Sequence, residues 1–169
     1  MHSGPLFIMM IGVPHSGKTT VRKELIKSVF SQSEVVVLST DDYIEEVALN
    51  KNLTYNEVFK ETIDEATSWL NRQFDLAVQS KKNIILDQTN LTQNTRRKKL
   101  CRIPKEYSLW AVDCMVHDIE THNKQIENVP LGRRIPFPLI ESMRGNYQPP
   151  LHTEGFDFIH TINPISKKE

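Results

Sequence analysis

The sequence predicts an α/β protein built around a parallel β-sheet. Apolar segments that suit strands alternate along the chain with segments whose apolar residues have helical spacing. The main apolar segments are continuous runs, which is typical of strands covered on both faces in a parallel sheet. A glycine-punctuated loop joins the first of these runs to a helical segment. Together these observations favour an α/β sandwich with a parallel sheet.

The length and composition indicate one ordinary globular domain, spanning residues 1–169. A chain of 169 residues can bury roughly 70% of its unfolded surface in a single core. Hydrophobic residues make up 38% of the chain and charged residues 25%, which suits a globular protein. No internal repeat or low-complexity segment divides the sequence.

The charge balance excludes a general attraction to polyanions. A net formal charge of +0 means that binding to nucleic acid or anionic lipid would need a local basic patch. The N-terminal apolar run lacks the features of a signal peptide and is shorter than the ~20 residues of a membrane span. Cys101 and Cys114 lack the spacing of a metal or redox motif. We expect two reduced thiols, a cytoplasmic location and no membrane partner.

The first half of the chain predicts two strands and three helices. Residues 6–11 form an apolar run, and residues 34–40 are rich in β-branched side chains, so both segments indicate buried strands. We expect a helix from about residue 18 to 31 and a short helix with an acidic start over residues 41–50.

The third helix is predicted by a capping box. Thr54 precedes Glu57 by three residues, the spacing that lets each side chain cap the other's backbone N–H. Apolar residues then recur at nearly helical spacing, at Val58, Ile63, Ala66, Leu70, Phe74 and Ala77.

The second half of the chain continues the alternation. Strands are expected at residues 83–89, 107–116 and 156–162, and helices at residues 94–101, 118–128 and 138–147. The helix at 94–101 is strongly basic, and the simplest interpretation of most of its charges is a solvated face. Prolines and glycine break the segment at about 128–138, which predicts a loop that can act as a lid.

The loop GVPHSGKTT at residues 12–20 matches the phosphate-binding pattern G-x-x-x-x-G-K-[ST]. Its backbone N–H groups can point at phosphate oxygens, and the following helix adds the positive end of its dipole. In this pattern Lys18 contacts the β- and γ-phosphates, and the Thr19 hydroxyl ligates Mg²⁺. The expected nucleotide-binding residues are Gly12, Pro14, His15, Ser16, Gly17, Lys18, Thr19 and Thr20, although His15 fills a free position of the motif. The alternative is a glycine-containing turn without a ligand.

Three carboxylates follow the second and third predicted strands. Ligands of open α/β sheets collect at the carboxyl ends of the strands, where Asp41, Asp42 and Asp87 are expected. One such carboxylate can accept the proton of an attacking hydroxyl, and another can bind Mg²⁺ directly or through water, a role we assign to Asp87 with Thr19. The alternative for Asp41 and Asp42 is helix capping, and for Asp87 a hydrogen bond at the strand end.

Several segments together resemble a known family. The segments GVPHSGKTT, STDDY, DQTNLT followed by Arg96, THNKQ, IPFPLIESM and YQPPLHTEGFDFI are similar to the kinase domain of the polynucleotide 5′-hydroxyl kinases of bacteriophages and of DNA- and RNA-repair enzymes. The phosphate-binding loop is generic, whereas the D-x-T-N and P-x-x-x-E-G-F elements are more specific. The resemblance covers nearly the whole chain in the right order.

The resemblance implies a fold and a reaction. The fold is a three-layer P-loop kinase of the adenylate-kinase type, with five parallel strands in the order 2-3-1-4-5. The reaction is the ATP- and Mg²⁺-dependent transfer of the γ-phosphate to the 5′-OH end of DNA or RNA, with Asp41 as general base. The resemblance further implies that acceptor-side contacts come from Asp42, Asp87, Thr89, Asn90 and Arg96. Because the chain is too short for an added phosphatase or ligase domain, separate partners with those activities are possible.

The sequence departs from the family at two positions. Some members carry an arginine three residues after the base, where this chain has Ile44. The family's lid arginine follows the HN element, where this chain has KQIEN. The candidates for that role become Arg133 and Arg134, or Lys124, and we favour Arg134 because it directly precedes the IP element. Two other functions stay open: a P-loop kinase of nucleosides, sugars or other small molecules, which Ile44 and the zero net charge favour, and a non-catalytic module that senses ATP.

Overall fold

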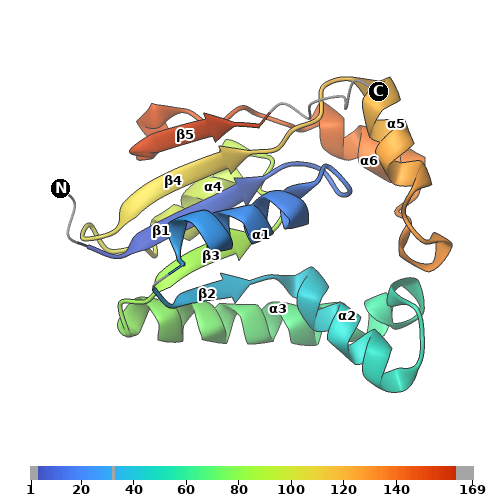
Figure 1. Ribbon diagram of the computed structural model, residues 1–169, viewed down its shortest axis with the longest axis horizontal. Helices are drawn as coiled ribbons and strands as arrows, with labels where there is room; N and C mark the ends of the chain where they lie inside the picture. Colours follow the sequence, from blue (N-terminus) through green and yellow to red (C-terminus); the bar gives the residue numbers. More distant parts are fainter. Residues whose placement is uncertain (1–3, 32, 163–169) are drawn as a thin grey trace.

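The protein is described by a computed structural model over residues 4–31 and 33–162, and a parallel β-sheet forms its centre (Figure 1). The strands are β1 (Leu6–Ile11), β2 (Val35–Leu38), β3 (Asn83–Asp87), β4 (Ser108–Asp113) and β5 (Phe158–Thr161). They lie in the order β2-β3-β1-β4-β5, and every neighbouring pair is parallel. The predicted parallel sheet and its order 2-3-1-4-5 are confirmed.

Helices cover both faces of the sheet, and others lie beyond the carboxyl ends of its strands. They are α1 (Lys18–Val29), α2 (Thr40–Lys51), α3 (Tyr55–Gln79), α4 (Gln93–Leu100), α5 (Ile119–Glu127) and α6 (Phe137–Gly145), with short 3₁₀ helices η1 (Leu131–Arg133) and η2 (His152–Glu154). Figure 1 shows α1 in front of the sheet and α3 and α4 behind it, whereas α2, α5 and α6 lie beyond the arrowheads of the strands. The carboxyl ends of the strands therefore face these three helices.

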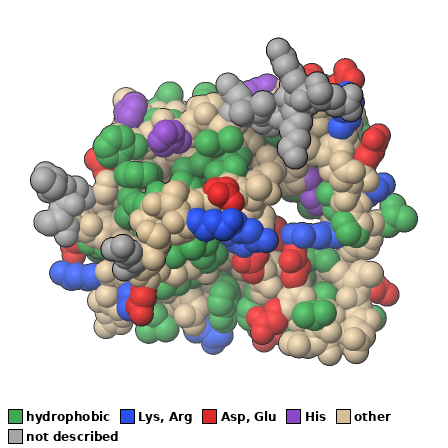
Figure 2. Space-filling view, in the orientation of Figure 1, with side chains coloured by type: hydrophobic (Ala, Val, Ile, Leu, Met, Phe, Trp, Pro, Cys, Tyr) green, Lys and Arg blue, Asp and Glu red, His purple; other side chains and the backbone are tan. Residues whose placement is uncertain are grey.

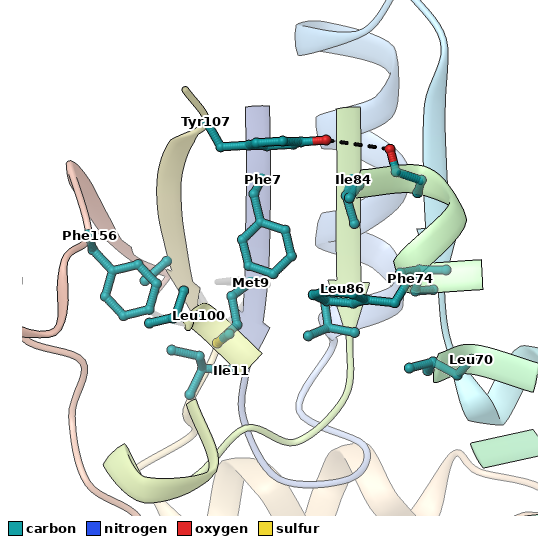
Figure 3. Close-up of a cluster of buried hydrophobic side chains, with 13 residues drawn as sticks. Phe7, Met9, Ile11, Leu70, Phe74, Ile84, Leu86, Leu100, Tyr107 and Phe156 are labelled. Atoms are coloured by element: carbon teal, nitrogen blue, oxygen red, sulfur yellow. Dashed lines mark hydrogen bonds between the residues drawn. The ribbon is translucent and has the colours of Figure 1, made fainter. Parts of the chain in front are cut away.

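The continuous apolar run of β1 is explained by burial on both sides. Phe7 packs with Phe74 of α3 and Leu100 of α4 in one core cluster (Figure 3). The Phe7 and Phe74 rings meet edge to face, with centroids 6.0 Å apart. Ile8 points to the opposite face, where Leu25 of α1 packs against its cluster. Because successive side chains of a strand alternate between faces, a strand between two helical layers must be apolar throughout.

The long helix α3 differs from the prediction at one core position. Its capping box is present, since the Glu57 carboxylate accepts a hydrogen bond from the Thr54 backbone N–H at 2.7 Å. The buried row is Val58, Thr62, Ala66, Leu70, Phe74 and Ala77, so Thr62 occupies the place predicted for Ile63. Ile63 is half-buried in the neighbouring cluster between α2 and α3. A spacing of about four residues keeps these side chains on one buried face of the helix. A prediction from apolar residues alone therefore missed the polar Thr62.

The remaining elements start and end close to their expected bounds. β1 has the predicted bounds, and the other four strands are shorter than predicted. The expected loop near 128–138 contains η1, and its last residues already belong to α6. No helix in the described ranges is both long and apolar enough to cross a membrane.

Candidate active site

A cavity of about 270 Å³ lies at the carboxyl ends of β1, β2 and β3. It is lined by Pro14, His15, Gly17, Lys18, Thr19, Ser39, Asp41, Asp42, Tyr55, Asp87, Asn128, Val129, Pro130, Arg133 and Ile135. These residues come from the loop after β1, the start of α2, the start of α3, the end of β3 and the segment that contains η1. One cavity thus brings together the phosphate-binding motif, the predicted acids and the predicted lid.

The loop after β1 has the backbone of a phosphate cradle. Gly12 has φ 149°, and a Cβ there would lie 2.7 Å from Ser16 Oγ, so the position admits only glycine without rearrangement. Gly17 has φ 89° and directly precedes α1. The backbone N–H groups of Gly17, Lys18 and Thr19 have no acceptor within the described residues. A loop with free N–H groups before a helix N-terminus is suited to bind an anion.

The side chain of Lys18 is folded back onto this loop. Its Nζ donates hydrogen bonds to the carbonyl oxygens of Gly12, at 2.9 Å, and Val13, at 2.7 Å. Burial lowers the pKa of Lys18, and the carboxylates of Asp87 and Asp41 oppose that shift. A phosphate that entered the cradle would offer the ammonium group a charged partner in place of two carbonyls.

His15 lies at the tip of the loop in a left-handed conformation, with φ 62°. Burial, and then the positive charge of Arg133, lower its pKa to about 4. The imidazole is therefore neutral near pH 7. Its Nε2 and the neighbouring Ser16 Oγ are buried and have no hydrogen-bond partner within the described residues. Of the two residues, His15 lines the cavity, so its Nε2 is the one placed to meet a ligand in the cradle.

The acids of α2 do not cap their own helix. Ser39 is the N-cap, and its Oγ accepts a hydrogen bond from the Asp42 N–H at 3.2 Å. Asp41 is exposed to the cavity, and its Oδ1 accepts a hydrogen bond from the Tyr55 hydroxyl at 2.8 Å. Asp41 therefore does not cap the helix, although the negative charges of Asp41 and Asp42 still interact favourably with the positive end of the helix dipole. Tyr55, which sequence reasoning did not single out, orients this carboxylate.

Arg22 is a second residue that sequence reasoning missed. It follows Lys18 by one turn of α1 and is only 7% exposed. Its guanidinium lies 2.9 Å from Asp42 Oδ2 and 2.9 Å from Asp87 Oδ2, so it joins the acids at the ends of β2 and β3. Burial raises the pKa of Asp87, and the charges of Lys18 and Arg22 oppose that shift. The spacing of four residues from Lys18 was the available signal, because it puts both cations on one face of the helix.

The two lid arginines have different positions. Arg133 lines the cavity and pairs with Glu45 of α2. Arg134 donates instead to the carbonyl oxygens of Val129, at 2.7 Å, and Glu127, at 2.6 Å, and it does not line the cavity. The structure therefore brings Arg133 to the cavity, whereas Arg134, which we favoured from the sequence, donates to carbonyl oxygens of the lid segment itself.

The D-x-T-N element and Arg96 support the site through contacts that lie outside the cavity. Gly12 N–H donates to the Thr89 carbonyl at 3.0 Å, and the Asn90 amide donates to the Met10 carbonyl at 2.7 Å. Arg96 is fully buried, and its Nε and one terminal nitrogen each lie 2.8 Å from the Glu154 carboxylate. The structure thus places Thr89, Asn90 and Arg96 outside the cavity lining, and their polar groups hold the cradle and the C-terminal segment together. Ser16 and Thr20 also lie outside the lining.

A buried histidine links the cradle to the lid-side helices. His122 of α5 is 0% exposed, and its Nε2 lies 2.9 Å from the Pro14 carbonyl oxygen. Arg144 of α6 contacts His122 Nδ1 and donates to the Val116 carbonyl at 2.6 Å. Because Arg144 can only donate, Nδ1 accepts and Nε2–H donates to Pro14. This network fixes the tip of the cradle against α5 and α6.

A groove of about 320 Å³ continues from the cavity on the side of α3. It is lined by Tyr55, Asn56, Phe59, Arg134, Ile135, Pro136 and Leu139, so the cavity and the groove share Tyr55 and Ile135. The rings of Tyr55 and Phe59 lie 5.6 Å apart, and Phe59 is 39% exposed. The groove is mainly apolar, and its lining includes Tyr55, whose hydroxyl donates to Asp41.

Comparison with known proteins identifies a family and a set of structural neighbours. The family described as AAA domain (AAA_33) matches residues 7–149. A putative kinase from Chloroflexus aurantiacus J-10-fl has TM-score 0.69 and 19% identity, over 98% of this chain and 89% of that chain. A gluconokinase from Sinorhizobium meliloti 1021 has TM-score 0.58 and 13% identity, over 96% and 84%.

A chain of the Pnkp1/Rnl/Hen1 RNA repair complex is also similar, with TM-score 0.65 and 20% identity. The match covers 94% of the present chain and 48% of the repair-complex chain, so the present chain spans about half the length of that relative. At these identities the likeness shows the fold alone, which is that of the P-loop kinases.

Proposed function

The chain belongs to the AAA domain family AAA_33 and has a P-loop kinase fold, and from this premise we propose that it is an ATP- and Mg²⁺-dependent polynucleotide 5′-hydroxyl kinase. The observation that carries this proposal is the position of Asp41. Its carboxylate lines the same cavity as Lys18 and Gly17 of the phosphate cradle. A base on one side and a cradle on the other are what transfer of a phosphoryl group to a hydroxyl requires.

The donor nucleotide is bound by the cradle in this proposal. The free N–H groups of Gly17, Lys18 and Thr19 receive the phosphate oxygens, and Lys18 exchanges its carbonyl acceptors for the β- and γ-phosphates. A Cβ built on Gly17 would meet no atom within 4 Å, which leaves room for a phosphate against the backbone. Arg133 neutralises charge on the phosphoryl group as it moves.

The acceptor hydroxyl loses its proton to Asp41 as its oxygen attacks the γ-phosphorus. The bond from phosphorus to the β–γ bridging oxygen breaks, and ADP is the leaving group. The hydrogen bond from the Tyr55 hydroxyl holds one oxygen of Asp41, so the other oxygen is available to take the proton. Proton transfer of this kind contributes about 10²–10⁴-fold to the rate.

The residues present fit a Mg²⁺ ion that is held largely by phosphate and water. Among the described residues no group of three or more His, Cys, Asp or Glu side chains could bind a metal by itself. Thr19 and Asp87 line the cavity and would hold the ion, which commonly takes few protein ligands beside substrate phosphates. When bound, the ion supplies positive charge to the triphosphate.

The apolar groove beside Asp41 is the space into which the body of the acceptor can extend. Its aromatic pair, Tyr55 and Phe59, offers a surface on which a terminal base can stack. Acidic side chains gather over the area of α2, next to a short row of Lys and Arg side chains (Figure 2), so this face offers no continuous basic surface for a long duplex. The proposal is therefore for a single-stranded end, and DNA and RNA ends are equally compatible.

A second candidate function is a small-molecule kinase. Ile44 occupies the position at which some polynucleotide 5′-hydroxyl kinases carry an arginine that binds a substrate phosphate. Its side chain is fully buried between α2 and α3. No acceptor can reach that position, and this observation favours a neutral acceptor such as a nucleoside or sugar.

The test is a labelling experiment with γ-labelled ATP and a panel of 5′-OH DNA, 5′-OH RNA, nucleosides and sugars. The proposal expects label on oligonucleotide ends, with activity that weakens markedly between low and moderate salt. Label on nucleosides or sugars alone, with little salt dependence, would establish the second candidate. Tight ATP binding with no labelled acceptor would contradict both and favour an ATP-sensing module.

A further inference from the structure

The lid segment is attached to the start of α3 by close contacts. The Asn56 amide donates to the Arg134 carbonyl oxygen at 3.2 Å. A Cβ built on Gly132 would lie 2.5 Å from Thr54 Cγ2, so only glycine allows this approach. These contacts hold the backbone on both sides of Arg133, and they leave its long side chain to be directed by another group.

That group is Glu45 of α2, whose carboxylate pairs with the Arg133 guanidinium. The side chains are about equally exposed, 42% for Arg133 and 38% for Glu45. Burial raises the pKa of Glu45, and the charge of Arg133 opposes that shift. An ion pair of this exposure contributes little to folding stability, so its significance lies in where it directs the arginine.

The position of Glu45 on its helix connects it with the proposed base. Glu45 follows Asp41 by four residues on α2, and residues at this spacing lie on the same face one turn apart. The helix therefore carries the base in its first turn and the partner of the lid arginine in the next. A single rigid element determines the separation between them.

We propose that Glu45 is a positioning residue for phosphoryl transfer, which holds the Arg133 guanidinium at the cavity in fixed register with Asp41. The arginine has five N–H donors, so it can keep contact with Glu45 and still turn donors toward a phosphoryl group. This inference rests on the proposed kinase function and deepens it, because it does not depend on the identity of the acceptor.

The first test compares Glu45→Gln with Glu46→Gln. Glu46 is the adjacent exposed acid on α2 and does not line the cavity, so it controls for the loss of one charge. Glu45→Gln is expected to lower kcat by about 10-fold to 100-fold, because a misplacement of about 1 Å in a catalytic group can cost that much. KM for ATP should change little, since the arginine acts in the transition state. Glu46→Gln should behave as the unmodified protein.

The second test is a double-mutant cycle with Arg133→Ala. If Glu45 acts through Arg133, Glu45→Gln should have almost no further effect on kcat once the arginine is absent. If Glu45 has a purely structural role, Glu45→Gln should lower kcat by the same factor with and without Arg133→Ala. Thermal unfolding of each variant shows whether a loss of activity comes from misfolding.

Three results would overturn the inference. They are full activity of Glu45→Gln, an equal loss in both backgrounds of the double-mutant cycle, and faster turnover of Glu45→Gln, which would mean that Glu45 withholds the arginine from the phosphate. All three require that the unmodified protein transfers phosphate. If the unmodified protein labels no acceptor, the proposed function fails instead, so the two failures are distinct.

Discussion

The donor side and the acceptor side of the cavity are built in different ways. The donor side is one continuous segment from the end of β1 into α1, and its contacts are local, such as Lys18 Nζ with the Gly12 carbonyl oxygen. The acceptor side is assembled from residues far apart in sequence. Tyr55 holds Asp41 from another helix, and Arg133 pairs with Glu45 across more than half of the chain.

This difference separates phosphate binding, which does not depend on the acceptor, from the contacts that select and position the acceptor. A local motif binds phosphate through backbone geometry, so it can be used with any acceptor. Pairs between distant elements determine which groups face the acceptor and how closely the lid approaches. Substitutions on the two sides should therefore affect different steps, and the following predictions test that separation.

The largest effect is expected from the lid arginines. Arg133→Ala should lower kcat by about 10³–10⁵-fold, because an arginine at the transferring phosphate neutralises transition-state charge. Arg134→Ala should lower it by no more than about 10-fold, since the Arg134 guanidinium donates to carbonyl oxygens of the lid segment and does not line the cavity. Steady-state transfer from γ-labelled ATP measures both. Equal losses in the two variants would contradict the assignment of Arg133.

The next effect is expected from the acids of α2. Asp41→Asn should lower kcat by about 10²–10⁴-fold while the affinity for ATP is unchanged, because the base acts on the acceptor and not on the donor. Asp42→Asn is the matched control. It should mainly loosen the contact with Arg22 and reduce stability, which thermal unfolding detects. Retained activity in Asp41→Asn would show that another group takes the proton.

Tyr55→Phe should have a smaller effect on the same side. Removal of the hydroxyl leaves the Asp41 carboxylate without its hydrogen bond, and a loss of about 10-fold in kcat is the expected size. Since the ring remains, stacking in the groove should be preserved. An unchanged kcat would mean that solvent orients the carboxylate equally well.

The smallest effect is expected on the donor side, from the pH dependence of stability. Burial lowers the pKa of His15 in the folded protein to about 4, below its ordinary value of 6.5. Between these values the unfolded chain binds a proton that the folded protein does not, so His15 makes stability fall as the pH decreases from 6.5 to 4. His15→Asn should reduce this fall in thermal unfolding measured over that range, and an identical fall would contradict the shift.

The sequence predicted the donor side and the sheet better than the acceptor side. The phosphate cradle follows from a pattern of adjacent residues, and Asp41 and Asp87 followed from the rule that ligands gather at the carboxyl ends of parallel strands. The strand order was implied by the family resemblance and confirmed by the structure. Arg133 and Arg134 were both candidates for the lid arginine. Arg134 donates to the carbonyl oxygens of Val129 and Glu127 instead of lining the cavity, and no local sequence pattern encodes these hydrogen bonds.

The surroundings of other residues could not be predicted because they arise from tertiary contacts. Arg96 follows a family element, and its burial against Glu154 becomes visible only when α4 and η2 are placed side by side. His122 likewise obtains its role from Pro14, more than a hundred residues away in the chain. Such pairings need the fold before they can be recognised.

A crystal structure with a non-hydrolysable ATP analogue and Mg²⁺ would test the role of Asp41 most directly. We expect the triphosphate to lie in the cradle of residues 12–20, with its terminal phosphate between Lys18 and Arg133 and facing Asp41. An analogue bound with its terminal phosphate directed away from Asp41, or bound outside the cradle, would show that the first turn of α2 does not supply the base.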